Sequence, residues 1–412
     1  MKYLILGDIH LGRGVSIGKP GVGKELNSRV KDQYVLLNWV LETAIDYKVT
    51  DIIITGDVYH DPRPHPTLIS LFMAWLKDCE KADICTHIIA GNHDLIRSGS
   101  YMMSALDIVK AVEFPNAFVY KTITQINLCS AGQPGIVFTF VPYRDRRMYE
   151  AETSQEALDL FKQELIESID HNVIGEHRRV LVGHMPIEGS IQVGDEIADS
   201  LNEIFCPADM FDNNWDAVFM GHIHNPHVIQ KKKGRKAHVA HVGSMDRSDF
   251  SLAEREQPKS IILLNPNADD KVITVPTRNL RKVEVDVPQG KDSTEYAINA
   301  ICLFDKQKSL MDAIVRLEIQ LSADATNTDR KKVQDYLYTN LGVHYICNYT
   351  ESRKISAIKF EAEKIFDQSI GTTEAINRYA EAQDMKSDER AEFKKLAHDC
   401  HREYEESVDA ST

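Results

Sequence analysis

Five short motifs, each placed directly after a run of apolar residues, constrain the fold of this 412-residue chain more than any other feature. In chain order they are Asp8-Ile9-His10, Gly56-Asp57, Gly91-Asn92-His93-Asp94, Gly183-His184 and Gly221-His222-Ile223-His224. Short apolar runs that alternate with helical patterns are typical of an α/β domain. In such a domain, the loops that follow the carboxyl ends of the strands gather at one edge of the sheet. We therefore predict that all five motifs meet in one cleft.

The apolar runs before Val275 predict the strands of this domain. They cover residues 3–6, 51–55, 87–90, 136–140, 180–182, 217–220, 237–242 and 260–264. Between the first two runs, apolar residues recur at helical spacing behind Asn27 or Ser28, either of which is a good residue to cap a helix start. The chain is therefore expected to begin as a β-α-β unit.

Beyond Val275 the pattern changes. Strands are expected at 282–287, 314–321 and 344–349, and helices at 294–304 and 329–341, which together form a small α/β module. From about residue 351 onward the chain looks helical and highly charged, with narrow apolar stripes. The stripes contain Ile376, Tyr379 and Ala380, and then Phe393, Leu396, Ala397, Cys400 and Tyr404. We predict three domains, at 1–275, 276–350 and 351–412.

Charge and cysteine usage narrow the class of protein. A formal net charge of −14 argues against a protein that coats DNA, because phosphate groups are bound by Lys and Arg. Any DNA contact must then be local, and solvated turns explain the basic clusters equally well. These clusters are Lys231, Lys232, Lys233, Arg235 and Lys236, and separately Arg144, Arg146 and Arg147.

The seven cysteines are widely scattered and form no C-x-x-C pair, so the sequence indicates neither a disulfide framework nor a zinc ribbon. This usage fits a reducing compartment, and we expect a cytoplasmic protein. No run approaches the roughly 18 apolar residues of a membrane span, so no membrane partner is expected.

The residue types in the motifs are those that bind a pair of divalent ions. Two ions about 3.5–4 Å apart need a shared carboxylate and a shell of imidazole and oxygen donors. Asp57 is the natural shared ligand. The predicted ligands are Asp8, His10 and His224 for one ion, and Asn92, His184 and His222 for the other. Each motif alone has a simpler explanation as a turn or a surface histidine, so the metal hypothesis depends on their joint occurrence in this order.

One segment imitates a different site. Gly18 to Glu25 spells most of a P-loop, but Glu25 stands where a Ser or Thr hydroxyl would hold Mg²⁺. No predicted strand precedes Gly18 directly, so we expect no nucleotide site there.

The five motifs resemble the pattern of the calcineurin-like metallophosphoesterases, D-x-H, G-D, G-N-H-[DE], G-H and G-H-x-H. Three local features resemble the SbcD/Mre-type nuclease subunits within that group. They are the opening Gly7-Asp8-Ile9-His10-Leu11-Gly12, His60 three residues after Asp57, and Gly243-Ser244-Met245-Asp246-Arg247-Ser248-Asp249-Phe250. The resemblance covers about the first 265 residues well and the remainder only in layout. The insertion from Arg13 to Gly23 departs from it.

The resemblance implies an α/β fold with a β-sandwich core flanked by helices, a small α/β capping domain that binds DNA and a C-terminal helical tail. It implies a DNA exonuclease and endonuclease that uses two Mn²⁺ or Mg²⁺ ions and acts on double-stranded ends and hairpins. It also implies a homodimer, here through helices at 68–75 and 101–106, and an SbcC-type ABC ATPase of the structural-maintenance class as partner. The sequence identifies no individual DNA-binding residue.

In the expected reaction, a metal-activated water attacks phosphorus and His93 protonates the leaving oxygen. His60 would position His93 or the phosphate. Asp94 would either fix a histidine tautomer or form a turn, and Arg247 and Asp249 would stabilise a loop. Two alternatives remain open: a calcineurin-like phosphatase acting on a phosphoprotein or small phosphate ester, and a non-catalytic scaffold. The extra modules count against the first, and the complete ligand set counts against the second.

Overall fold

The structure is a computed structural model, and it divides into two compact units. It describes residues 1–23, 25–98, 101–128, 135–170, 177–190, 202–266, 268–353, 373, 376–377, 380–381 and 387–409. One unit comprises Met1–Val285, Thr294–Ile319 and Thr328–Thr350, and the other comprises Asp286–Ser293, Gln320–Asn327 and Glu351–Thr412. Within the described segments, no helix combines the length and the apolar character needed to cross a membrane.

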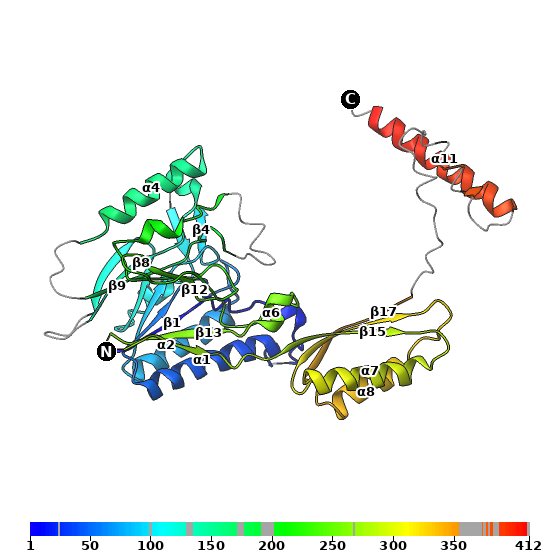
Figure 1. The fold of residues 1–412 in the computed structure, drawn as a ribbon, viewed down its shortest axis with the longest axis horizontal. Coiled ribbons are helices and arrows are strands. Elements are labelled where there is room, and N and C mark those ends of the chain that lie inside the picture. Colours follow the sequence, from blue (N-terminus) through cyan, green and yellow to red (C-terminus); the bar gives the residue numbers. More distant parts are fainter. Residues whose placement is uncertain are drawn as a thin grey trace. The chain divides into compact units, whose positions relative to one another are not determined.

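Two six-stranded sheets form the core of the first unit (Figure 1). The first sheet has the order β14 (Lys271–Thr274), β13 (Ser260–Leu264), β1 (Tyr3–Leu6), β2 (Asp51–Ile54), β3 (Cys85–Ile89) and β6 (Ala117–Tyr120). The second has the order β11 (His227–Gln230), β12 (His238–His241), β10 (Ala217–Met220), β9 (Arg178–Gly183), β8 (Ile136–Val141) and β7 (Thr124–Leu128). β1, β2, β3 and β6 are mutually parallel, as are β8, β9, β10 and β12.

The space between the sheets is filled by apolar side chains from both of them. Tyr3, Ile53 and Ile89 of the first sheet pack with Phe138 and Phe219 of the second, all almost completely buried. Each sheet alternates these inward residues with outward ones that a helix covers, as the two-residue period of a strand requires. The result is an α/β fold with a β-sandwich core flanked by helices, as predicted.

Helices α1 (Ser28–Tyr47) and α2 (Pro66–Lys81) cover the outer face of the first sheet, and α4 (Ser154–Glu167) covers that of the second (Figure 1). Asn27 caps α1, since its side chain accepts a hydrogen bond from the backbone N–H of Arg29 at 2.9 Å. Shorter helical segments complete this region: α3 (Asp107–Ala111), α6 (Leu252–Glu256) and the 3-10 turns η1 (Val15–Ile17), η2 (Arg146–Tyr149) and η4 (Ala208–Phe211).

The expected helix at 101–106 is wrong. That segment instead forms β5 (Tyr101–Ser104), which pairs in antiparallel fashion with β4 (Leu95–Ser98). Ile96 lies opposite Met103, and cross-strand pairs of this kind stabilise a hairpin. An apolar run of four residues is too short to distinguish a strand from a helix. The sequence also missed β6, β7, β11 and β14, which are short strands at or near the sheet edges.

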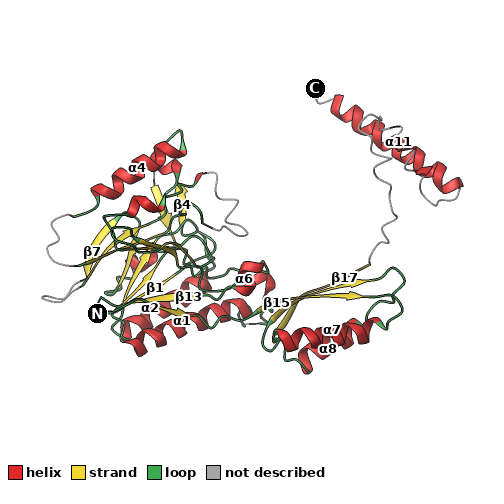
Figure 2. Cartoon of the chain, in the orientation of Figure 1, coloured by secondary structure: helices red, strands yellow, loops and turns green. Residues whose placement is uncertain are grey.

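The module after Val275 is a three-stranded sheet with two helices along one face (Figure 2). Its strands are β15 (Leu280–Val287), β16 (Ile314–Leu321) and β17 (Tyr345–Arg353), and its helices are α7 (Ser293–Gln307) and α8 (Arg330–Thr339). β17 continues to Arg353, so the residues expected to form a polar link to the tail belong to a strand instead. Within the first unit, the Arg278 guanidinium donates to both carboxylate oxygens of Asp32 in α1 at 2.8–3.1 Å.

The C-terminal tail contains α11 (Ser387–Asp409). Lys394 Nζ donates to the Glu381 carboxylate at 3.1 Å, so α11 contacts the preceding part of the tail. Of the apolar residues predicted to form stripes, Ala380 is buried whereas Leu396 is 65% exposed. Tyr379 and the side chain of Tyr404 lie outside the described residues.

Candidate metal centre

The five motifs follow the carboxyl ends of five central strands. Asp8 follows β1, Asp57 follows β2, Asn92 follows β3, and His184 and His222 follow β9 and β10. Because these strands run parallel within each sheet, their carboxyl ends face the same edge of the sandwich. The structure brings all seven predicted ligands together there.

The first group contains Asp8, His10 and His224. The Nε2 atoms of His10 and His224 lie 2.9 Å apart, and Nε2 of His224 lies 3.7 Å from Oδ2 of Asp8. Ligand atoms of all three side chains fall within 4.8 Å of one another, and all three residues are buried. Such a cluster of one carboxylate and two imidazoles has the composition of a divalent-metal site.

The second group contains Asn92, His184 and His222. The Asn92 side-chain oxygen lies 2.9 Å from Nε2 of His184 and 3.2 Å from Nδ1 of His222. A backbone carbonyl fixes the orientation of one ring, since Nδ1 of His184 lies 3.0 Å from the Thr55 oxygen. Nε2 of His184 is therefore the nitrogen that faces the other ligands.

Asp57 lies between the two groups. Its Oδ2 is 3.5 Å from Nε2 of His10 and 3.3 Å from Nε2 of His184, so one carboxylate oxygen touches both sides. Its Oδ1 accepts a hydrogen bond from the backbone N–H of His93 at 2.9 Å. This arrangement suits a carboxylate shared by two ions.

The glycines of the motifs leave room for the ligands of neighbouring motifs. A Cβ atom on Gly91 would lie 2.1 Å from Oδ1 of Asp57, and one on Gly221 would lie 2.4 Å from Oδ1 of Asp8. Both distances are far below van der Waals contact. The spacing of glycine and ligand in the sequence is therefore a packing requirement of the site.

Three of the predicted ligands adopt left-handed backbone conformations. φ is 48° at His10, 48° at Asp57 and 76° at His222. Such conformations are uncommon for residues other than glycine and are concentrated at functional sites. At His222, the backbone N–H donates to Oδ2 of Asp8 at 2.9 Å, which stabilises this turn.

Burial and mutual interaction shift the pKa values of the ligands. Burial raises the pKa of Asp8 to about 6. For His184, burial acts in the opposite direction, but attraction to Asp57 and Asp8 outweighs it and raises the pKa to about 9. Burial, together with nearby positive groups, holds the pKa of His10 and His224 well below the ordinary value. These two neutral rings therefore keep a lone pair for an ion.

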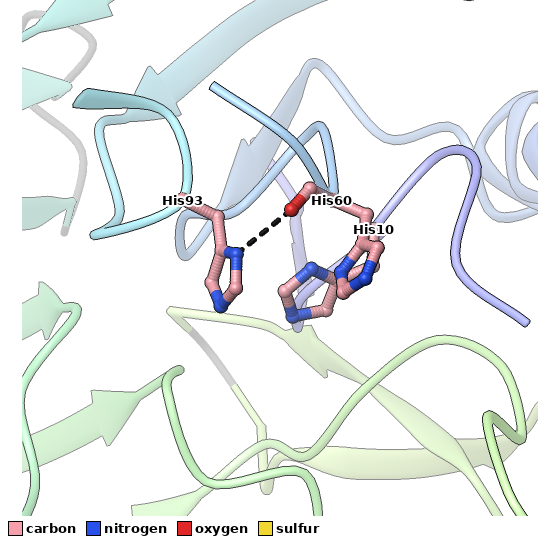
Figure 3. A group of neighbouring side chains, drawn as sticks. All are labelled: His10, His60 and His93. Atoms are coloured by element: carbon pink, nitrogen blue, oxygen red, sulfur yellow. Dashed lines mark hydrogen bonds between the residues drawn. The ribbon is translucent and has the colours of Figure 1, made fainter. Parts of the chain in front are cut away.

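His60 and His93 lie beside the first group (Figure 3). Their rings stack with centroids 5.4 Å apart, and Nδ1 of His93 lies 2.8 Å from the backbone oxygen of His60. The carbonyl can only accept, so Nδ1 of His93 carries a proton and Nε2 remains for exchange with a substrate. His60 thus contacts His93 through its main chain as well as its ring.

Asp94 contacts backbone rather than a histidine ring. Its carboxylate accepts hydrogen bonds from the backbone N–H groups of Val58, Tyr59 and Gly91 at 3.1–3.3 Å. It therefore connects the loop after β2 to the loop after β3, which favours the turn role considered for it. Burial, with a contribution from Asp57, raises the pKa of Asp94 to about 7 despite these three bonds.

Arg247 also has a structural setting. Its Nε donates to the Thr277 hydroxyl at 3.0 Å, and a terminal nitrogen donates to the Glu254 carbonyl. The basic cluster from Lys231 to Lys236 is exposed and follows β11, at the end of the second sheet opposite the motif loops. A cavity of about 760 Å³ lined by residues such as Arg178, His238 and Val272 contains none of the predicted ligands.

Sequence reasoning missed two charged residues at the site. A terminal nitrogen of Arg13 lies 2.7 Å from Nδ1 of His224, and Oε1 of Glu203 lies 2.7 Å from Nε2 of His222. Arg13 is in the stretch that the sequence set aside as an insertion, and Glu203 is in no motif. Only the fold brings either residue to the ligands.

The donor set fits two divalent ions. Carboxylate, imidazole and amide oxygen converge on one shared carboxylate, which is the composition expected of a two-metal site. In this arrangement, Asp8, His10 and His224 would hold one ion, Asn92, His184 and His222 the other, and Asp57 both.

Comparisons with known proteins agree with this geometry. A family model described as calcineurin-like phosphoesterase matches residues 1–226. A relative from Staphylococcus saprophyticus, named as the SbcD component of the nuclease SbcCD, is 26% identical over 294 residues. The matched region covers 69% of this chain and 71% of the relative.

Two solved structures show partial similarity. A dimetal phosphatase from Danio rerio has 11% identity and a TM-score of 0.38, with 67% of this chain and 99% of that chain covered. A hypothetical protein from Thermus thermophilus has 13% identity and a TM-score of 0.34, with 67% and 100% covered. Because the family model matches more than half of the sequence, this chain belongs to the calcineurin-like phosphoesterase family, whose members use divalent metals.

Proposed function

We propose that this phosphoesterase is the DNA nuclease component of an SbcCD-like DNA-end-processing complex. The observation that carries the proposal is the Asp57 carboxylate between two groups of ligands, in a chain 26% identical to an SbcD nuclease. The ions would be two divalent metals, with Mn²⁺ preferred and Mg²⁺ as the alternative. The substrates would be double-stranded DNA ends and hairpins, and the protein would act in the cytoplasm.

The seven residues Asp8, His10, Asp57, Asn92, His184, His222 and His224 are the proposed ligands. When bound, the ions would supply charge stabilisation for the phosphoryl group and an activated water. His93 would give the proton on Nε2 to the leaving sugar oxygen, held in place by the His60 carbonyl at 2.8 Å. Arg13, a buried guanidinium beside His224, is placed to pair with a phosphate oxygen.

The further parts of the chain have proposed roles in the same complex. Residues 1–275 would form the nuclease domain, 276–350 a capping domain that contacts DNA, and 351–412 a tail that docks onto the coiled-coil base of an SbcC-type ABC ATPase. Exposed Leu396 of α11 is suited to a helix-in-groove contact. Deleting the residues after 356 should abolish co-purification with the ATPase and leave Mn²⁺-dependent nuclease activity largely intact. Undiminished binding of the truncated chain would contradict the tail role.

A homodimer is also proposed, on a smaller surface than the sequence indicated. Phe72 and Trp75 of α2 are completely buried, and Trp75 Nε1 donates to the Leu37 carbonyl at 2.8 Å, so both residues serve the core. Leu68 and Leu71 of α2, and α3 in place of the longer expected helix, remain for the contact. Light scattering that gave a monomer mass at micromolar concentration would contradict the dimer.

The deciding experiment is digestion of end-labelled duplex and hairpin DNA with Mn²⁺, with and without a candidate ATPase. Wild-type protein should shorten or open both substrates, and Asp57→Ala should not. A phosphopeptide and p-nitrophenyl phosphate serve as competing substrates. Rapid hydrolysis of these esters with intact DNA would show a phosphatase instead. Absence of any hydrolysis and of bound metal would show a non-catalytic scaffold.

A further inference from the structure

Glu203 is a buried carboxylate at the back of the second group of ligands. It lies after β9 in the chain and forms an isolated backbone bridge with Asp145. Its side chain is fully buried, and Oε1 lies 2.7 Å from Nε2 of His222. The other ring nitrogen of His222, Nδ1, faces the Asn92 oxygen. Glu203 therefore contacts the side of the ring that is turned away from the other ligands.

The carboxylate and the ring nitrogen lie within reach of each other but are not aligned. Among the described residues, neither carboxylate oxygen of Glu203 completes a hydrogen bond, and Nε2 of His222 completes none either. A buried carboxylate without a hydrogen bond is unfavourable, so a protein retains one where it has a use. A small rotation of the imidazole would convert the 2.7 Å approach into an N–H to carboxylate bond.

His184 supplies an internal comparison. Its Nδ1 faces the Thr55 carbonyl at 3.0 Å, which leaves Nε2 for the ligand side. At His222 the nitrogens are exchanged, with Nδ1 on the ligand side and Nε2 on the outer side. Each ring thus has one outer acceptor that selects its tautomer, a backbone carbonyl for His184 and a carboxylate for His222. A carboxylate also makes the imidazole more basic and a stronger ligand.

We propose that Glu203 is a positioning residue for the metal centre. It accepts the Nε2 proton of His222, fixes the tautomer with a free lone pair on Nδ1, and holds the ring against the strain of a backbone with φ of 76°. The inference rests on the proposed two-metal site and extends it to a residue outside all five motifs. Its consequence is confined to the ion that His222 would bind.

The test is Mn²⁺ titration calorimetry on the full-length chain. Glu203→Gln should weaken the affinity for one of the two ions by about 10-fold to 100-fold, as loss of such an outer partner typically does, and should leave the affinity for the other ion unchanged. Without metal, its melting temperature should equal or exceed that of wild type, because an unpaired buried charge has been removed. Exposed Glu188, replaced in Glu188→Gln, is the matched control and should titrate as wild type.

The outcomes separate the inference from the proposed function. Wild-type affinities for both ions in Glu203→Gln would overturn the positioning role while leaving the metal centre in place. Equal weakening of both ions, together with a lower melting temperature without metal, would show a structural role only and would also overturn it. Wild-type protein that bound no Mn²⁺ would instead contradict the proposed metal centre. Glu203→Asp, which keeps the charge but shortens the reach, should behave like Glu203→Gln.

Discussion

The backbone N–H of His93 donates to Oδ1 of Asp57 at 2.9 Å. The residue proposed as proton donor is therefore attached to the residue proposed as shared ligand, yet their side chains serve different steps. His93→Ala should lower phosphodiester hydrolysis by about 10²-fold to 10⁴-fold because the leaving oxygen receives no proton, while both ions still bind. Asp57→Ala should lose activity and metal together. Hydrolysis of bis-p-nitrophenyl phosphate and elemental analysis of the purified variants measure the two effects.

The same pair of variants contains its own control, because the backbone N–H of His93 is unchanged in His93→Ala. Loss of metal from His93→Ala equal to that from Asp57→Ala would show that His93 is a ligand and that the proton-donor role is wrong.

Gly91→Ala should disrupt the centre without a change in charge. The added Cβ would lie 2.1 Å from Oδ1 of Asp57, so the carboxylate must move away from its position between His10 and His184. We expect reduced Mn²⁺ stoichiometry and a loss of hydrolysis at least 100-fold in size, about 3 kcal/mol by the usual conversion of rate into energy.

Gly189→Ala is the matched control for the added methyl group. Gly189 has a φ of 82° with open space around it, so that change should cost stability only, about 1 kcal/mol. Normal metal content in Gly91→Ala would contradict the packing argument.

Asp94→Ala should destabilise the protein more than an average substitution. It removes the acceptor of three backbone N–H groups, in Val58, Tyr59 and Gly91, and leaves them without that partner inside the protein. A loss on the order of 3 kcal/mol in unfolding free energy is expected from groups of this kind. Denaturant unfolding in EDTA measures it without a contribution from bound metal. A change below about 0.5 kcal/mol would show that the two loops hold together without Asp94.

His241 makes the stability of the metal-free protein depend on pH. Burial lowers its pKa to about 3, and its ring lies between the Gly221 carbonyl and the Ser190 hydroxyl. Between about pH 6.5 and 3 the unfolded chain binds a proton at this residue and the folded chain does not. The unfolding free energy therefore falls as the pH is lowered through that window, by about 1.4 kcal/mol per pH unit from this group.

His241→Asn should reduce this slope by about one proton, measured by denaturant unfolding in EDTA at several pH values from about 7 to 5. The slope that remains comes from other buried histidines such as His10 and His224, whose pKa values are lowered as well. Ser190→Ala keeps the imidazole and should keep the wild-type slope. An unchanged slope in His241→Asn would show that the ring is solvated or protonated in the folded state.

The strands that carry the motifs were predictable because each is an apolar run followed directly by Gly, Asp, Asn or His. β1, β10 and β13 begin and end where the sequence indicated, and β16 does so in the module. The interior positions of β1, β10 and β13 are buried on both faces, so composition alone distinguishes them. β6, β7 and β14 contain partly exposed residues and lack that signal, and the β4–β5 hairpin has apolar runs too short to show a period.

The sequence by itself determined the ligand chemistry, since the residue types and the order of the five motifs are local properties of the chain. The tertiary structure decided the rest, because it depends on which distant segments the sheets bring together. The position of Asp57 between His10 and His184, the backbone contacts of Asp94, and the approach of Arg13 and Glu203 to the outer ligands all join residues far apart in the chain. Contacts of this kind leave no periodic or motif signal in the sequence, whereas burial at the end of an apolar strand does.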